Sequence, residues 1–144
     1  MAEVVLALDV GEARIGVARG ELGSQFAFGR GFISRQGSSA DVSAVAEAAR
    51  AEGATRVVVG LPRRTDGKDS AQTLRVREFI AALETAGLTV DVEDERFTTR
   101  LATSQILGSG QSKRRRQEKG RVDEASAVLI LETYLRRMGA RAGE

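Results

Sequence analysis

The chain has 144 residues and a formal net charge of +2, with 22 lysines and arginines against 20 aspartates and glutamates, and it contains neither cysteine nor histidine. These absences exclude disulfides, thiol nucleophiles, imidazole bases and zinc sites built from cysteine and histidine, so a bound metal ion needs oxygen ligands, which suit Mg²⁺ or Mn²⁺. The length predicts one domain over residues 1–144, and because the sequence has neither a long apolar run nor a secretion signal, we expect a cytoplasmic protein without a membrane partner.

Three strands are predicted at the beginning of the chain. The run VVLALDV at Val4–Val10 is apolar and rich in β-branched residues, which is typical of a buried strand. Gly11 ends this run, and residues 14–19 and 26–33 have the composition of two further strands. Because the connections between them are short, we expect an antiparallel meander.

Helices and strands alternate along the middle of the chain. Residues 41–52 are rich in alanine and predict a helix, with Asp41 as its N-cap and Gly53 as its end. The segments that follow predict a strand at residues 56–61, a helix at residues 71–86 and a strand at residues 89–95. Together with the meander, this order predicts an α/β fold with a mixed five-stranded sheet and helices on both faces.

The end of the chain predicts two helices around a basic segment. We expect a helix at residues 98–107, a mobile loop at about residues 108–120 and a final helix at residues 122–138. Six of the nine residues at 113–121, KRRRQEKGR, are basic. Clustered cations favour contact with a polyanion such as RNA, although a solubilising loop explains them too. The candidate nucleic-acid contacts in this segment are Lys113, Arg114, Arg115, Arg116, Lys119 and Arg121.

Asp9 interrupts an apolar strand. Because side chains alternate along a strand, Asp9 shares a face with Val5 and Ala7 and should point into packed surroundings. A buried carboxylate is unfavourable by several kcal/mol unless it is paired or bound to a metal. Two interpretations stay open: Asp9 takes part in a catalytic metal site, or it holds the turn at Gly11 or pairs with Arg14.

Two further acidic clusters stand at the ends of predicted elements. In the fifth strand, the alternation of side chains groups Asp94 with the apolar residues and favours it over Glu95 as the inward acid. At the start of the last helix, either Asp123 or Glu124 can face the sheet, and both complement the helix dipole. Without a functional site, the cluster in the fifth strand is a solvated strand end, and the cluster in the last helix is an ordinary helix start. If acids from these places converge with Asp9, bound divalent cations would suit phosphodiester hydrolysis.

Four motifs occur together, in order, along nearly the whole chain. They are ALDVGEARIGVA at residues 7–18, VVVGLPRRTDG at 57–67, DERFTT at 94–99 and KGRVDEASAVLILE at 119–132. In these motifs and their spacing, the sequence resembles the YqgF/RuvX family of bacterial pre-16S rRNA nucleases, which are similar to Holliday junction resolvases. The resemblance implies an RNase H-like fold and a metal-dependent nuclease that matures the 5′ end of 16S rRNA.

The resemblance also implies roles for particular residues. The family's acidic positions fall on Asp9, Glu95 and Asp123, as catalytic groups and ligands of Mg²⁺ or Mn²⁺, so Glu95 replaces Asp94 as the expected acid. Candidate phosphate contacts around the other motifs are Arg63, Arg64, Lys68 and Arg96. A solvated loop, or an ion pair in the case of Arg96, explains these cations about as well. The chain departs from the family at Arg64, where asparagine is more frequent, and we expect this change to alter contacts with the substrate backbone.

Several functions are compatible with these features. The expected partner is RNA, as pre-16S rRNA or a ribosomal precursor particle, and the expected state is a monomer or weak homodimer. A resolvase of branched DNA is the alternative within the same class, and that reaction needs two active sites related by a two-fold axis. An actin-like or sugar-kinase-type ATPase closes two such domains over a nucleotide, whereas this length predicts one. A non-catalytic nucleic-acid-binding factor would retain the acids without cleaving.

Overall fold

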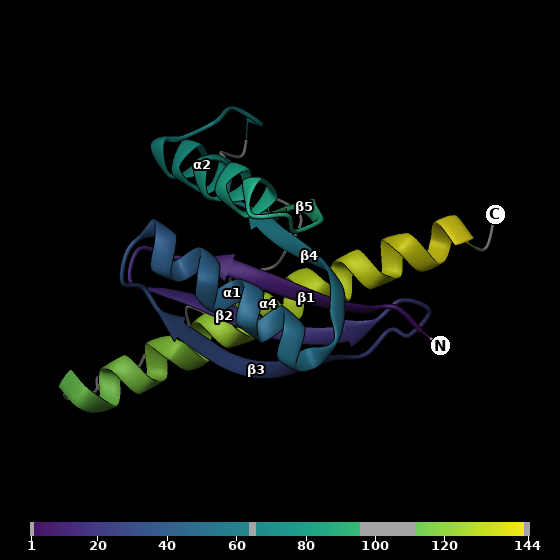
Figure 1. Cartoon of the computed structure of the whole chain (residues 1–144), viewed down its shortest axis with the longest axis horizontal. Helices are drawn as coiled ribbons and strands as arrows, with labels where there is room; N and C mark the ends of the chain where they lie inside the picture. Colours follow the sequence, from purple (N-terminus) through teal and green to yellow (C-terminus); the bar gives the residue numbers. More distant parts are fainter. Residues whose placement is uncertain (1, 64–65, 96–111, 143–144) are drawn as a thin grey trace.

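A five-stranded sheet forms the centre of the protein (Figure 1). The computed structural model describes residues 2–63, 66–95 and 112–142 of the chain. The strands are β1 (Val4–Val10), β2 (Arg14–Glu21), β3 (Ala27–Ser34), β4 (Ala54–Leu61) and β5 (Val90–Asp94), arranged in the order β3-β2-β1-β4-β5. Strands β1, β2 and β3 form an antiparallel meander, while β4 pairs parallel with β1 and β5 pairs parallel with β4. The mixed sheet and the meander predicted from the sequence are therefore confirmed.

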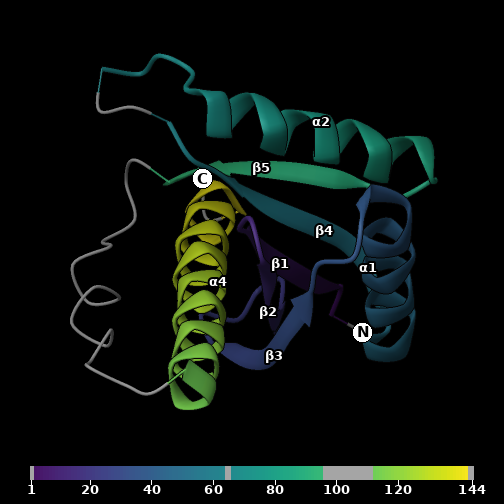
Figure 2. The same ribbon diagram turned by 90° about the vertical axis from the view of Figure 1, so that its left-hand side faces the viewer.

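Helices cover both faces of the sheet (Figure 2). Helices α1 (Ser38–Glu52) and α2 (Ala71–Thr85) pack on one face, and helix α4 (Ser112–Ala142) packs on the other. Strand β1 lies between these layers, and its residues from Val5 to Leu8 are completely buried. A strand buried on both faces must be apolar throughout, which is why β1 and β4 are nearly continuous runs of valine, leucine and alanine.

The start of α1 differs from the prediction. The helix begins at Ser38, after Gly37, and Asp41 lies inside its first turn instead of capping it. The carboxylate of Asp41 accepts hydrogen bonds from the Gln36 backbone N–H at 2.9 Å and from Arg35 Nε at 3.0 Å. Asp41 therefore holds the segment before the helix. The predicted end is confirmed, because Gly53 closes the helix in the left-handed conformation, with φ 71°.

Helix α4 begins much earlier than the sequence pattern indicated. It has 31 residues, which corresponds to a length of about 46 Å, and both of its ends reach past the sheet in Figure 1. The loop expected at residues 108–120 is thus wrong from residue 112 onward, where the backbone is helical. Residues 108–111 and the helix expected at 98–107 lie outside the described residues. Within the part that is described, no helix is long and apolar enough to cross a membrane.

Candidate active site

The carboxyl ends of β1, β4 and β5 meet at one edge of the sheet, because the three strands run parallel. Asp9 is half-buried near the end of β1 and pairs with Gly16 of β2. Its side chain points to the same face as those of Val5 and Ala7, which pack against α4. This is the face that the alternation of side chains in the sequence predicts for Asp9.

Gly16 allows helix α4 to touch the sheet directly beside Asp9. A Cβ atom at Gly16 would lie 1.9 Å from the backbone carbonyl oxygen of Asp123, so no other residue fits this position without displacing the helix. The close approach brings Asp123 next to the strand pair that carries Asp9. A glycine within a predicted strand is a signal of such an approach, and Gly16 shows it here.

Arg14 is the ion-pair partner of Asp123. Arg14 Nε donates to Asp123 Oδ2 at 2.9 Å, and both side chains are mostly buried, with exposed fractions of 18% and 21%. Burial raises the pKa of Asp123 above its ordinary value, and this effect exceeds the opposite effect of the hydrogen bond and charge of Arg14 and of the charge of Lys119. The sequence hypothesis had considered Arg14 as a partner of Asp9, whereas the structure directs it to Asp123.

Glu95 follows β5 and points to the same face as Asp9. It is buried, with 5% exposed, and its carboxylate lies against Gly60, where a Cβ atom would be 2.8 Å from Glu95 Oε1. Gly60 follows Val59, the residue of β4 that pairs with Leu8, so Gly60 lies beside Asp9 in the sheet. Two glycines thus link the acids: Gly60 lies between Asp9 and Glu95, and Gly16 lies between Asp9 and Asp123.

The expectation that Asp94 is the inward acid is wrong. Strand alternation separated Asp94 from Glu95 correctly, but helices pack on both faces of β5, and Glu95 lies buried on the face of α4. On that face Glu93 is also buried, and Arg137 binds its carboxylate at 3.0 Å. Asp94 instead lies 3.6 Å from Arg63 Nη1 on the other side of the strand.

Glu124 has a different position from its neighbour Asp123. Its Oε2 atom accepts a hydrogen bond from the backbone N–H of Gly31 in β3 at 2.6 Å, and its side chain packs over Gly29. Glu124 therefore joins α4 to the edge strand, while Asp123 faces the part of the sheet that carries Asp9. The structure separates two residues that spacing alone left equivalent.

The chemistry of these acids fits a hard divalent cation, since Mg²⁺ and Mn²⁺ prefer carboxylate oxygens. Among the residues that the structure describes, however, no three acidic side chains form a group that could hold a metal ion. The ion pair with Arg14 occupies Asp123 in this arrangement. Carboxylate oxygens are suitable ligands for Mg²⁺ or Mn²⁺, but no three of the described acidic side chains lie close enough to bind one ion.

The candidate phosphate contacts are distributed unevenly. Arg63 lies between two carboxylates, at 3.6 Å from both Asp69 and Asp94, so its charge is already balanced. Lys68 and Arg121 are exposed, and Lys119 is half-buried close enough to Asp123 to lower the pKa of that carboxyl. The candidates Arg64 and Arg96, and the side chains of Lys113, Arg114, Arg115 and Arg116, lie outside the described residues.

Comparisons with known proteins relate the chain to one family. The profile of the RuvX family, described as "Holliday junction resolvase", matches residues 3–137. A Thermus thermophilus protein named "Putative pre-16S rRNA nuclease" is 49% identical over 131 residues, which cover 91% of this chain and 96% of the relative. "Ribonuclease YqgF" of Deinococcus radiodurans is 44% identical over 133 residues, 92% of this chain and 88% of the relative.

Solved structures share the fold at low sequence identity. The RuvC protein of Thermus thermophilus, solved in complex with a Holliday junction substrate, matches with a TM-score of 0.56 and 15% identity over 98% of this chain and 96% of that chain. The Fowlpox virus resolvase, solved with Holliday junction DNA, matches with a TM-score of 0.53 and 11% identity over 92% of this chain and 98% of that chain. The likeness shows an RNase H-like fold.

Proposed function

The chain belongs to the RuvX family, and on this premise we propose that it is a metal-dependent nuclease that hydrolyses phosphodiester bonds in RNA, with pre-16S rRNA or a ribosomal precursor particle as its substrate. Two relatives named "Putative pre-16S rRNA nuclease" and "Ribonuclease YqgF", at 49% and 44% identity, support this proposal. The reaction makes the protein a hydrolase, acting in the cytoplasm as a monomer or weak homodimer.

The observation that carries this proposal is the placement of three acids on one side of one sheet edge. Asp9, Glu95 and Asp123 come from β1, the end of β5 and α4, and close approaches at Gly16 and Gly60 place them around the same part of the sheet. Arg14 balances the charge of Asp123 in this arrangement, and Glu95 is buried beside Gly60. A function that uses the acids explains this arrangement better than a structural role does.

The three acids would hold Mg²⁺ or Mn²⁺, with Asp123 released from Arg14 to take part. Bound divalent ions supply activation of water and stabilisation of the leaving oxygen in phosphodiester hydrolysis. This chain's own contribution is to position the acids at this edge of the sheet. Lys119, one helical turn before Asp123, stands where it can meet a phosphate of the substrate.

Cleavage assays with matched variants test the proposal. We expect the wild-type protein with Mg²⁺ or Mn²⁺ to cut precursor rRNA, and Glu95→Gln to lose that activity. Asp94→Asn is the control, because it removes the same charge one residue away on the opposite face of the strand. Equal activity in both variants would contradict the role of Glu95.

A four-way DNA junction in the same assay distinguishes the resolvase alternative. Symmetrical cutting of a junction requires two active sites, so the mass of the protein in solution, measured by light scattering, should be that of a dimer if junctions are the substrate. We expect RNA cleavage by a monomer. Binding of RNA without cleavage under any divalent ion would identify a non-catalytic factor instead.

A further inference from the structure

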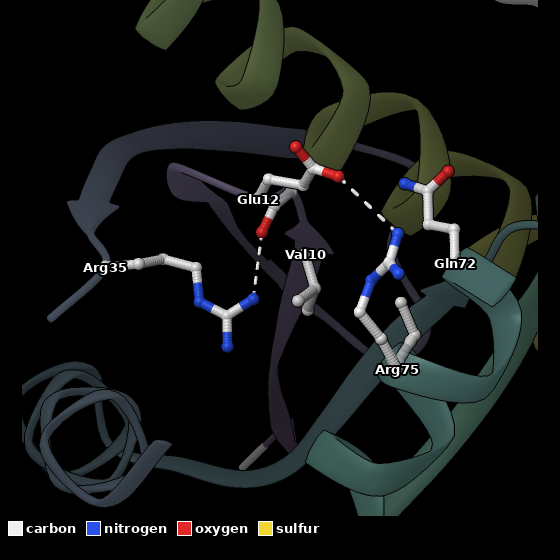
Figure 3. A pocket seen from close by; sticks show the side chains of 7 residues that line it. Val10, Glu12, Arg35, Gln72 and Arg75 are labelled. Atoms are coloured by element: carbon white, nitrogen blue, oxygen red, sulfur yellow. Dashed lines mark hydrogen bonds and ion pairs between the residues drawn. The ribbon is translucent and has the colours of Figure 1, made fainter. Parts of the chain in front are cut away.

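A pocket of about 340 Å³ opens at the turn between β1 and β2, on the face of the sheet covered by α1 and α2 (Figure 3). Val10 and Val76 give it apolar walls, and both belong to the buried core on this side of the sheet. Its size falls in the range of pockets that bind small organic groups, which begins at about 300 Å³. The acids of the candidate active site do not line it.

The pocket nevertheless adjoins the acid site in the chain and in space. Asp9 and Val10 are consecutive residues of one strand, so their side chains point to opposite faces. Asp9 faces α4, and Val10 faces the pocket. The turn that begins at Gly11, closed by a hydrogen bond from the Gly11 N–H to the Arg14 carbonyl, separates the two sites at the same edge of the sheet.

Two arginines stand on opposite sides of Val10 at the mouth of the pocket (Figure 3). Arg35 is fixed: its Nε atom donates to Asp41 at 3.0 Å, its Nη1 atom donates to the Gly11 carbonyl at 2.9 Å, and its guanidinium lies over the Phe79 ring. A guanidinium plane held in this way offers a rigid surface on which a nucleobase can stack.

Arg75, in contrast, is loosely held. Its guanidinium is 3.5 Å from the carboxylate of Glu12, and the two side chains are 59% and 84% exposed. An exposed ion pair of this kind contributes little to stability, so Arg75 can exchange Glu12 for another anion at small cost. Gln72, one turn earlier on α2, adds an amide that can donate and accept hydrogen bonds at the same mouth.

We propose that this pocket holds one nucleotide of the substrate strand, with its base between the valine walls and Arg35 and its phosphate on Arg75. The inference rests on the proposed nuclease function and assigns a second contact with the substrate strand, outside the acid site. The apolar walls and the planar cation suit the base, and the loosely held cation suits the phosphate. A strand passing around the β1–β2 turn would then reach the acid site on one side and the pocket on the other.

Because Glu12 pairs with Arg75, substitutions at these two residues should change the affinity for RNA in opposite directions. Glu12 competes with a phosphate for Arg75, so Glu12→Gln should strengthen binding while Arg75→Gln weakens it. Gln72→Phe fills the mouth of the pocket, whereas Gln72→Ala leaves it open. Arg77→Gln is the matched control. This substitution removes the same charge from α2 two residues further on, where Arg77 pairs with Asp69.

The experiment measures the affinity of each variant for a short labelled single-stranded RNA by fluorescence anisotropy, in EDTA and at several salt concentrations. We expect Arg75→Gln and Gln72→Phe to weaken binding by about threefold to tenfold. Only Arg75→Gln should also reduce the log–log salt slope, by about 0.7 for one lost phosphate contact. Glu12→Gln should bind more tightly than wild type, and the control Arg77→Gln should bind as wild type does. Gln72→Ala should weaken binding less than Gln72→Phe, because it removes one amide and leaves the pocket open.

Each other outcome overturns a definite part of the argument. If wild type binds RNA and all variants bind equally, the pocket is not part of the binding surface, and the proposed nuclease function is unaffected. If adenosine monophosphate displaces the RNA at equal concentration, the pocket is a site for free nucleotides and not for a strand. If wild type neither binds nor cleaves RNA, the proposed function fails and the pocket assignment fails with it.

Discussion

Arg14 Nε lies 2.9 Å from Asp123 Oδ2, so a mostly buried ion pair joins strand β2 to helix α4 across 109 positions of the sequence. The pair has two consequences. It fixes the helix over the sheet at the point where Gly16 permits contact, and it balances the charge of an acid whose burial raises its pKa. Structure and the proposed site therefore depend on the same two residues.

We predict a measurable coupling between these two residues. Arg14→Gln and Asp123→Asn should each destabilise the protein, and the double variant should be more stable than the sum of the two effects implies, by about 1–3 kcal/mol. Urea denaturation of the four proteins gives this coupling free energy. The exposed pair Arg75 and Glu12 provides the comparison, with an expected coupling below about 0.5 kcal/mol. Equal coupling in the two pairs would mean that Arg14 does not stabilise the buried carboxylate.

Gly16→Ala should be severely destabilising. The new Cβ atom would overlap the backbone of Asp123, which cannot move without shifting α4 along the sheet, and overpacking of this kind costs about 1–3 kcal/mol or more. Gly139→Ala in α4 is the control, because a Cβ atom there meets nothing within 4 Å. Alanine also favours helix over glycine by about 1 kcal/mol. Thermal unfolding should show a lower Tm for the first variant and an unchanged or higher Tm for the second.

Asp41 should make the protein sensitive to acid. Burial alone raises its pKa, but the hydrogen bonds from the Gln36 N–H and Arg35, together with the charge of Arg35, lower it below the ordinary value. A carboxyl whose pKa is lower in the folded state stabilises the fold above its unfolded pKa of about 3.9, and this contribution disappears as the pH falls through the folded pKa. Asp41→Asn should therefore destabilise at pH 7 and not at a pH below the folded value. Denaturant unfolding at both pH values measures the difference, and a constant difference would contradict the assignment.

Much of the sheet could be predicted from local patterns. The β-branched runs of β1 and β4 and the glycines that follow the first strand and helix α1 mark these elements because they reflect burial and backbone conformation. The start of α4 could not be read in this way. Its first turns are rich in lysine, arginine, glutamine and glutamate, which favour helix by propensity. They lack the periodic apolar residues that mark a helix packed on a sheet, and their clustered charge is equally typical of a loop.

Less of the candidate site than of the fold could be predicted from the sequence. Strand alternation predicts the face of Asp9 and separates Asp94 from Glu95. Because helices pack on both faces of β5, alternation alone does not show on which face the buried acids lie. Family resemblance supplied Glu95, and burial supports it. The partner of Asp123 could not be predicted, because no local pattern connects residues so far apart.

Asp9→Asn separates a catalytic role from a structural one. If Asp9, Glu95 and Asp123 act together, the protein without metal holds clustered negative charges, and removing one at nearly constant volume should leave the Tm unchanged or raise it. The stabilisation gained on adding Mn²⁺ should shrink, because stability linked to a ligand follows the affinity of the folded state. Cleavage of precursor rRNA should be lost.

If Asp9 serves the fold instead, the variant should be less stable by about 1–3 kcal/mol and should keep its response to Mn²⁺. Thermal unfolding with and without Mn²⁺, run beside the cleavage assay, distinguishes the two, and a lower Tm with an undiminished Mn²⁺ effect would remove Asp9 from the proposed active site.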